Sequence, residues 1–388
     1  MWRARTNTPT VDRPFSLTRG GPTYRLWLAL ARGNWLRLSL LVTAVTWSPI
    51  VVLSIVEWRA TGKLPSLFVS YSMHVKLLIA IPVLLAAEDV LHMRTGRCIE
   101  RIMDERWAEP TSKVAALVAG AERRRDSRIA EIVALVLALF GSQVVAWGVL
   151  QPLGVVRGRG LAAGSASAVW HAVVALGIYQ YLLIRWVWRW WIWTRLLWGL
   201  SRLKLRAIAT HPDKQGGLGF LAQPTVGFAV VIFAVCSVQA SVWADQVAFA
   251  HESVMSYKQE IAALLAFALL VTVGPLVVFI RPLWRARFDA IREYGRLAAD
   301  HARMFHARWI MRGEREELLG SPDVSSLADM GTSYEVIKDM RPLPFNLYNL
   351  IFIALAVLVP MVPLALMQVP LLELLGKLSG VAAGGIPH

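Results

Sequence analysis

Long apolar runs limit what this chain can fold into more than any other feature of its sequence. A helix needs about 20 mostly apolar residues to cross the hydrocarbon core of a bilayer. Seven segments meet this requirement, at residues 36–56, 67–87, 131–150, 170–193, 225–244, 261–280 and 347–367. The sequence therefore predicts an all-α, polytopic membrane protein with seven transmembrane helices.

The composition agrees with this class. Of the 388 residues, 56% are hydrophobic and 17% are charged, yet the net charge is +15. A soluble chain carries about a quarter charged residues, so the charges here must gather in the connections between apolar runs. Nucleic-acid binding would need basic residues on a soluble surface. Because these flank apolar segments, we expect anionic lipid headgroups as partners and no nucleic acid.

The distribution of lysine and arginine predicts the orientation. With the N-terminus in the cytoplasm, 34 of the 41 Lys and Arg residues fall before residue 38 or in the inner connections 88–129, 185–224 and 281–345. Basic residues collect on the cytoplasmic side of membrane proteins. We therefore expect an integral protein of a bacterial inner (plasma) membrane, with its N-terminus in the cytoplasm and its C-terminus outside.

The same pattern divides the chain into four parts. Residues 1–35 form a cytoplasmic or interfacial segment, in which 24–38 is either a helix lying in the headgroup layer or a lead-in to the first span. Residues 36–280 hold six spans and the basic loops 88–129 and 195–224. Residues 281–345 are a cytoplasmic helical extension whose apolar residues recur at near-helical spacing. Residues 346–388 hold the last span and an outer amphipathic tail.

An arginine- and tryptophan-rich stretch, residues 185–198, ends the fourth span. Six Trp residues alternate there with Arg185, Arg189 and Arg195. Trp and Arg favour the membrane interface, and Arg also stacks on indole rings. The stretch is either an interfacial anchor or a basic, aromatic vestibule that attracts anions. Since these side chains surround one helix, some of them must be buried against neighbouring helices.

Polar residues inside the predicted spans could line a path. Intramembrane charges usually face a bundle interior or a watery cavity, whereas amides more often hold helices together. The candidate pore or ion-binding residues are Lys76, His74, Gln143, Gln180, Gln239, Arg185 and Arg189.

The acidic residues near the spans all fall close to span ends, at Glu57, Glu88, Glu131 and Asp245. Proton-coupled pumps commonly use acids within the membrane. We therefore expect no buried carboxylate, and a site that suits anions or neutral solutes better than cations.

The glycine-rich loop 211–220 is the best candidate for a cytoplasmic polar site, through His211, Asp213 and Lys214. Glycines after a charged turn can expose backbone N–H groups as an anion nest. The same pattern is typical of a tight turn between two helices.

The sequence contains none of the short motifs that identify an enzyme reaction or a metal site. Cys98 lies in a basic loop and Cys236 in an apolar run, so we expect neither a disulfide nor a zinc site. No cofactor is expected.

Three functions from different classes fit these features. The first is a transport protein, an oligomeric channel or permeation pathway that favours anions, built as a homo-oligomer. The second is a scaffold or sensor whose basic loops bind a cytoplasmic protein or anionic lipid. The third is an enzyme that acts at the level of the lipid headgroups through His211 and Asp213.

Overall fold

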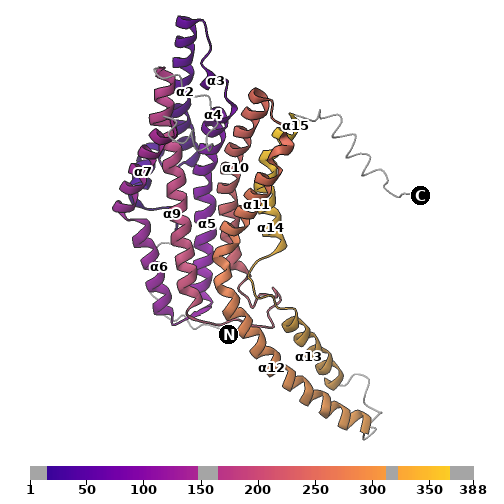
Figure 1. Ribbon diagram of the computed structural model, residues 1–388. Coiled ribbons are helices and arrows are strands. Elements are labelled where there is room, and N and C mark those ends of the chain that lie inside the picture. Colours follow the sequence, from indigo (N-terminus) through magenta and orange to yellow (C-terminus); the bar gives the residue numbers. More distant parts are fainter. Residues whose placement is uncertain (1–14, 147–164, 312–321, 368–388) are drawn as a thin grey trace, which may run out of the picture.

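Helices make up almost the whole molecule. The computed structural model describes residues 15–146, 165–311 and 322–367, and 84% of it is helical (Figure 1). Five helices in these ranges are long and apolar enough to cross a membrane: Trp35–Thr61, Ala166–Ser201, Gly219–Ala250, Val254–Met311 and Leu347–Leu366. The all-α membrane class is thus supported, whereas the predicted count of seven spans is not confirmed.

The N-terminal part forms two helices, α1 (Gly21–Ala31) and α2 (Trp35–Thr61). Arg32 ends α1 in the left-handed conformation, and the Asn34 side chain accepts hydrogen bonds from the first N–H groups of α2. Such a cap replaces the backbone acceptors that a helix N-terminus lacks. The segment 24–38, for which we expected either an interfacial helix or a lead-in to the first span, therefore holds a turn between α1 and the start of α2.

The second apolar segment is interrupted where the sequence predicts one span. It contains the short helices α3 (Ser66–Val69) and α4 (Tyr71–Val75), the π-helical turn η1 (Lys76–Ala80) and the start of α5 (Ile81–Asp104). The chain breaks at Ser70, which has an extended backbone. From α4 onward this segment packs along α2 and α10 (Gln223–Ala250).

The third apolar segment falls on α7 (Arg128–Ala146), which follows α6 (Thr111–Arg125) and packs along α9 (Leu176–Ser201). The last four residues of the predicted span lie outside the described ranges. One continuous helix then leads from α8 (Ala166–Trp170) through a second π-helical turn, η3 (His171–Ala175), into α9.

Buried side chains of α5, α9 and α10 form the centre of the bundle. Leu84, Leu91, Leu182 and Leu197 have almost no exposed surface, and the Trp186 indole donates to the Leu84 carbonyl oxygen at 3.2 Å. Lipid is as apolar as leucine, so close packing and polar contacts between helices hold such a bundle together, rather than the hydrophobic effect.

A long helix extends out of the bundle, and the helix that follows it packs back along its outer part to form a hairpin. Its parts are η5 (Val254–Tyr257), α11 (Lys258–Val273), η6 (Gly274–Phe279), α12 (Ile280–Phe305) and η7 (His306–Met311). The helix α13 (Pro322–Lys338) folds back along α12, and Arg308 binds Asp323 at 2.8 Å. Figure 1 shows this α12–α13 hairpin extending beyond one end of the bundle.

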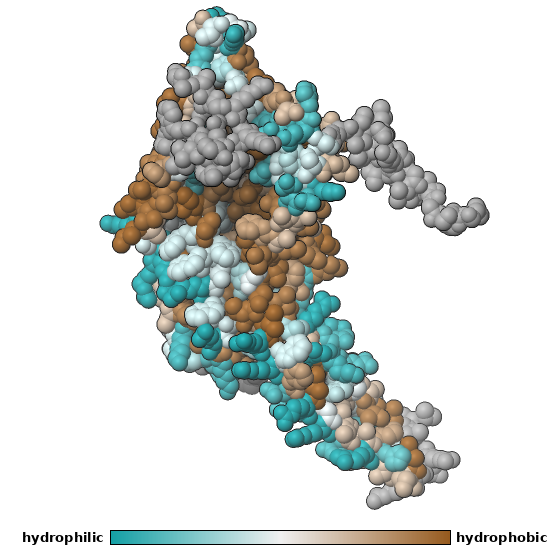
Figure 2. All heavy atoms as spheres, in the orientation of Figure 1, coloured by the Kyte–Doolittle hydropathy of each residue, from teal (hydrophilic) through white to brown (hydrophobic). Residues whose placement is uncertain are grey.

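The chain ends its described part with α14 (Leu347–Leu358), η8 (Val359–Met361) and α15 (Val362–Leu366), close to the predicted seventh span. The amphipathic tail predicted after that span lies outside the described residues. In Figure 2, hydrophobic residues form a band across the bundle, and hydrophilic residues cover the end that carries the hairpin.

Two loops meet at this hydrophilic end. The strand β1 (Ala108–Glu109) pairs antiparallel with β2 (Lys204–Leu205), and the 3₁₀ turn η4 (Gly219–Ala222) then leads into α10. The connections 88–129 and 195–224, both predicted to be cytoplasmic, thus lie at the same end of the molecule.

Candidate functional site

The arginines of α9 point in different directions, as the sequence requires. Arg185 and Arg189 are buried, with 6% and 4% of their surface exposed, whereas Arg195 is exposed. Among the tryptophans, Trp186 and Trp193 are buried, and Trp191 and Trp198 are exposed. The expectation that part of this stretch packs against neighbouring helices is confirmed.

A carboxylate from α5 lies beside the two buried arginines. Oε1 of Glu88 is 2.8 Å from Nη1 of Arg189 and 3.6 Å from Nη1 of Arg185. Glu88 itself is 8% exposed. The expectation of no buried acid near the spans is therefore wrong, because α5 continues well past residue 87 and keeps Glu88 inside the bundle.

Arg185 is the less satisfied of the pair. Arg189 also donates from Nη2 to the Thr18 carbonyl oxygen at 3.1 Å. The guanidinium of Arg185 lies over the rings of Trp27 (4.4 Å) and Tyr181 (5.7 Å). Although the Glu88 distances are those of ion pairs, Nη1 of each arginine lacks a hydrogen bond of good geometry within the described part of the chain.

The charges of this cluster do not balance. Two buried guanidinium groups share one buried carboxylate, and Glu131, the other carboxylate that acts electrostatically on Arg185, is engaged by Thr23, so the pair is only partly neutralised. Keeping an unpaired charge out of water costs several kcal/mol. A bound anion would remove this imbalance.

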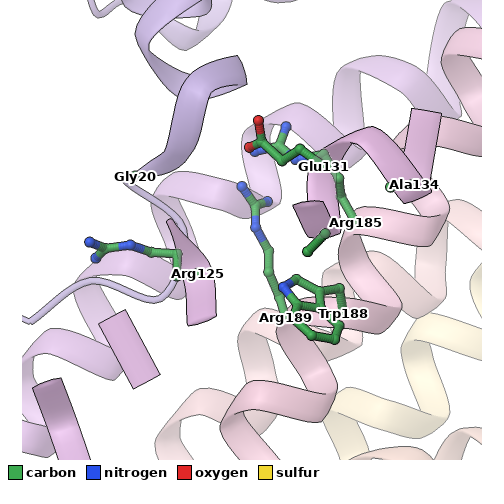
Figure 3. Close-up of a pocket in the computed structure, with 8 residues that line it drawn as sticks. Gly20, Arg125, Glu131, Ala134, Arg185, Trp188 and Arg189 are labelled. Carbon is green, nitrogen blue, oxygen red and sulfur yellow. The ribbon is translucent and has the colours of Figure 1, made fainter. Parts of the chain in front are cut away.

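The cluster opens onto a groove between α1, α7 and α9, which we call the basic groove. Its inner pocket is lined by Arg185, Arg189, Glu131, Trp188 and Arg125, among others, and has a cavity volume of about 20 Å³, which is space for a water-sized group. Figure 3 shows these side chains around the pocket, with Gly20 at one wall and Ala134 at another.

Two further hollows adjoin the inner pocket. One shares Glu131 with it and adds Arg25, Arg128 and Tyr181. The other shares Trp188 and adds Arg123, Arg124 and Trp191, whose ring stacks on that of Trp188 at 4.8 Å between centroids. In all, seven arginines but only two carboxylates line the three hollows.

Both groove carboxylates already have partners. Glu131 accepts hydrogen bonds from the Thr23 backbone N–H and hydroxyl at 3.0 and 2.9 Å. Asp126 binds Arg125 through two contacts of 2.8 Å. The arginines of the groove therefore outnumber its carboxylates, and the hollow lined by Arg123 and Arg124 has no carboxylate among its lining residues.

Lys76 and His74 lie close in sequence but differ in their surroundings. Nδ1 of His74 accepts from the Trp47 indole at 3.1 Å, and its Nε2 lies 2.8 Å from the Phe68 carbonyl oxygen. His74 is thereby held as a link between α2 and the second segment. Lys76 begins the π-helical turn η1 and is partly buried, with its Nζ 5.8 Å from the centre of the Tyr179 ring.

Within the described part of the chain, no contact joins Gln180 or Gln239 to Lys76. Gln180 on α9 lies against Gly141 of α7, where its Oε1 is 2.9 Å from the position that a Cβ would take. Gln239 is partly buried on α10. Gln143 lies on α7, and its side chain is outside the described part.

In the loop 211–220, the backbone N–H groups already bind an acid of the chain itself. The Asp213 carboxylate accepts from the N–H groups of Gln215 (2.8 Å), Gly217 (3.0 Å) and Gly219 (3.1 Å). Gly216 and Gly217 have positive φ angles, which glycine adopts without strain. The loop is thus an anion nest that Asp213 fills.

The neighbours of Asp213 fix the loop to the rest of the protein. Nδ1 of His211 lies 2.9 Å from the Asp213 carboxylate and accepts from the Asp213 backbone N–H at 3.2 Å. Lys214 donates to Asp339 at 2.7 Å, and its carbonyl oxygen accepts from the Arg341 N–H at 2.7 Å. The loop therefore anchors the segment that follows α13.

These contacts shift the acidity of two groups. Burial alone would raise the pKa of Asp213, but the N–H groups of Gln215, Gly217 and Gly219 outweigh it, so the pKa lies below its ordinary value. The hydrogen bond from Lys214 lowers the pKa of Asp339 in the same way. Both carboxylates are ionised at neutral pH.

Sequence reasoning found Arg185 and Arg189 but missed their surroundings. Glu88, Trp27 and the arginines of α6 come from segments 60 to 160 residues away, and only the fold brings them to α9. The run Arg123–Arg125 was a usable signal, because a basic cluster directly before a span marks the headgroup layer.

The described residues contain no group of three or more His, Cys, Asp or Glu side chains that could hold a metal ion. Cys98 and Cys236 are both buried and unpaired. In comparisons with known proteins, no family model matches the chain, and no curated protein or solved structure matches it either. The proposals below therefore rest on the geometry of the chain alone.

Proposed function

We propose that this chain is a membrane protein that recognises anionic phospholipids, with the headgroup phosphate bound in the basic groove. The observation that carries the proposal is the buried pair Arg185 and Arg189, which share the Glu88 carboxylate beside a groove lined by seven arginines and two carboxylates. Arginine binds phosphate through two parallel N–H donors.

The position of the groove supports a lipid rather than a soluble ligand. Its α9 residues, Arg185 to Trp191, belong to the arginine- and tryptophan-rich stretch of that helix, and Trp191 and the leucines of α1 are exposed. Tryptophan favours the headgroup level of a bilayer. A lipid seated there would place its phosphate near Arg185 and its chains along the exposed apolar face of α7.

The proposal includes the predicted orientation, with the basic end in the cytoplasm and seven spans. The pairing of β1 with β2 supports it. The connection 88–129 lies at the same end as 195–224, so the segment from α4 to α5 leads from the far end of α2 to the basic end. The α12–α13 hairpin then extends into the cytoplasm, where it offers a surface for a protein partner.

Lipid binding to the purified, full-length protein tests the function. The wild type should retain phosphatidylglycerol over phosphatidylcholine in native mass spectrometry, and Arg185→Gln should weaken the phosphatidylglycerol affinity at least tenfold. A tenfold change corresponds to about 1.4 kcal/mol. Arg281→Gln is the matched control, since Arg281 is exposed on α12.

Two results would contradict the proposal. One is equal retention of both lipids by the wild type, and the other is an unchanged phosphatidylglycerol affinity in Arg185→Gln. Inorganic phosphate forms a further arm of the experiment. If it competes fully with phosphatidylglycerol at equal concentration, the groove recognises free phosphate and not a lipid.

The second candidate function is an anion permeation pathway formed by a homo-oligomer. Lys76 favours it, because a lysine within an apolar, membrane-facing segment usually faces a bundle interior or a watery cavity. Purified protein in liposomes should then dissipate a chloride gradient faster than empty vesicles. Equal rates with and without protein would exclude this function.

A further inference from the structure

Each of the two hollows that adjoin the inner pocket of the basic groove has two arginines of its own. The first hollow, lined by Arg25 and Arg128 among others, has a cavity volume of about 500 Å³. The second hollow, lined by Arg123 and Arg124 among others, has a cavity volume of about 330 Å³. The inner pocket shares a lining residue with each hollow but holds only a water-sized group. A phosphate group therefore has room in either hollow and not in the inner pocket.

One turn of the chain separates the two hollows. Residues 123–128 lead from α6 into α7, and they line both hollows. Asp126 and Arg128 belong to the first hollow, whereas Arg124 and Ser127 belong to the second. Ser127 and Arg128 are consecutive, so their Cα atoms are about 3.8 Å apart. Two anionic groups joined by a short linker can therefore reach both hollows at once.

The four arginines of the two hollows have no acid of the chain as a partner. Within the described residues, no ion pair or side-chain hydrogen bond is formed by Arg25, Arg123, Arg124 or Arg128. The two carboxylates of the first hollow have other partners, since Asp126 binds Arg125 and Glu131 accepts from Thr23.

The excess of positive charge favours a ligand with more than one negative charge. Even with Glu88 included, the arginines of the groove outnumber its carboxylates by four. A lipid with two phosphates balances more of this excess than a lipid with one.

The surroundings of the turn are those of a headgroup layer. The helix α6 ends in three consecutive arginines, whereas α7 begins with apolar residues such as Ile129 and Ile132, which are 76% and 62% exposed. Ile132 also lines the first hollow, and exposed Trp191 lines the second. A ligand in either hollow thus meets arginines together with exposed apolar surface, which suits the headgroup and the acyl chains of a phospholipid.

We propose that the basic groove binds a phospholipid with two phosphates joined by a short linker, of the cardiolipin class, with one phosphate in each hollow. Arg25 and Arg128 bind one phosphate, and Arg123 and Arg124 bind the other. Basic pockets between transmembrane helices are typical sites for such headgroups. Because the two phosphates are linked, binding of the first raises the effective concentration of the second, so the affinity exceeds that of either phosphate alone.

This inference rests on the proposed function and narrows its ligand from anionic phospholipids in general to those with two phosphates. The two can fail separately. If the wild type retains phosphatidylglycerol over phosphatidylcholine but does not prefer cardiolipin to phosphatidylglycerol, the groove binds one phosphate at a time, and this inference alone is overturned.

Competition between cardiolipin and phosphatidylglycerol, measured by native mass spectrometry of the purified full-length protein, tests the inference. Phosphatidylglycerol is supplied at twice the molar concentration of cardiolipin, so that phosphates and acyl chains are present in equal amounts. The wild type should prefer cardiolipin at least tenfold. Two double variants, Arg25→Gln with Arg128→Gln and Arg123→Gln with Arg124→Gln, should each reduce this preference to about threefold or less, because only one phosphate then finds arginine partners in the hollows.

The matched control is the double variant Arg97→Gln with Arg281→Gln, which removes the same number of charges from exposed positions on α5 and α12 that line neither hollow. It should keep the wild-type preference. An equal loss in this control would overturn the inference, since the preference would then follow net charge alone.

The substituted arginines of the hollows are exposed, apart from the partly buried Arg124, so both variants should fold and unfold near the wild-type temperature. Two further results would contradict the inference. One is a cardiolipin preference that survives in either double variant of the hollows. The other is binding of two phosphatidylglycerol molecules as tight as that of one cardiolipin, which would show that the hollows hold separate lipids.

Discussion

At the scale of single residues, the few acids near the spans act as internal partners. Glu57, Asp245 and Glu131 each accept from N–H groups at the start of another helix, and Glu88 lies beside two arginines. A carboxylate that binds such N–H groups satisfies donors that have no partner within the helix. The acids therefore position helices against one another inside the chain.

Glu88→Gln should destabilise the protein by about 3 kcal/mol, because it leaves Arg185 and Arg189 buried without a counter-charge. Thermal unfolding in detergent should show a lower midpoint than the wild type. The double change Glu88→Gln and Arg189→Met removes one charge of each sign and should recover part of the loss. Glu100→Gln on the exposed side of α5 is the control. A Glu88→Gln protein that melts with the wild type would show that the pair is not strongly coupled.

At the scale of elements, the hydrophobic pattern located the helices well where one helix carries a whole segment. The predicted spans 225–244 and 347–367 coincide with α10 and with α14 to α15. The pattern did not show the break at Ser70 or the two π-helical turns, because these depend on contacts with distant residues. Asp245 is 175 residues from Ser70, and Glu57 is 110 residues from Ser167.

In the candidate site, too, some features are visible in the sequence and others depend on contacts in the fold. Arg185 and Arg189 stand out in the sequence because charge within an apolar, tryptophan-rich helix is rare. The glycine-rich loop also stands out, but its sequence fits an empty anion nest and a closed turn equally well. Only the direction of the Asp213 side chain, toward the N–H groups of Gly217 and Gly219, distinguishes the two.

Asp213→Ala should open the loop 211–219. The variant removes the acceptor of three backbone N–H groups, so the hydrogen-exchange protection of Gly217 and Gly219 should fall about tenfold. Protection in α10, which follows the loop, serves as the internal reference. Unchanged protection at both glycines would mean that the loop holds its shape without the carboxylate.

Acid should weaken the same loop in the wild type. Since the folded-state pKa of Asp213 is lowered, its stabilising contribution is fully present above the unfolded-state pKa of about 3.9. It is lost as the pH falls through the lower folded-state value. Wild-type protection should therefore approach that of Asp213→Ala only below about pH 4, and a loss at higher pH would contradict this role of Asp213.

At the scale of the whole molecule, the basic residues and the elements that extend from the bundle lie at the same end. The basic connections, the sheet of β1 and β2 and the α12–α13 hairpin lie at the hydrophilic end (Figures 1 and 2). The five long apolar helices alone would allow a chain in which residues 67–87 and 131–146 do not cross. In that arrangement the connection 88–129 would remain on the side of Lys63.

Cysteine labelling in intact cells separates the two arrangements. Both have an odd number of spans, so the positions of the termini cannot distinguish them, whereas Asp104 can. With seven spans, Lys63→Cys reacts with a membrane-impermeant maleimide and Asp104→Cys reacts only after permeabilisation. With five spans both react from outside. Both positions are exposed, and the native Cys98 and Cys236 are buried and give little background.

Nine Lys and Arg residues in 88–129 favour the cytoplasmic side. The same position must hold if the groove faces the anionic inner leaflet, because Arg123 and Arg124 lie in this connection and line the groove. Reaction of Asp104→Cys in intact cells would thus remove the second and third spans and the inner-leaflet lipid site together.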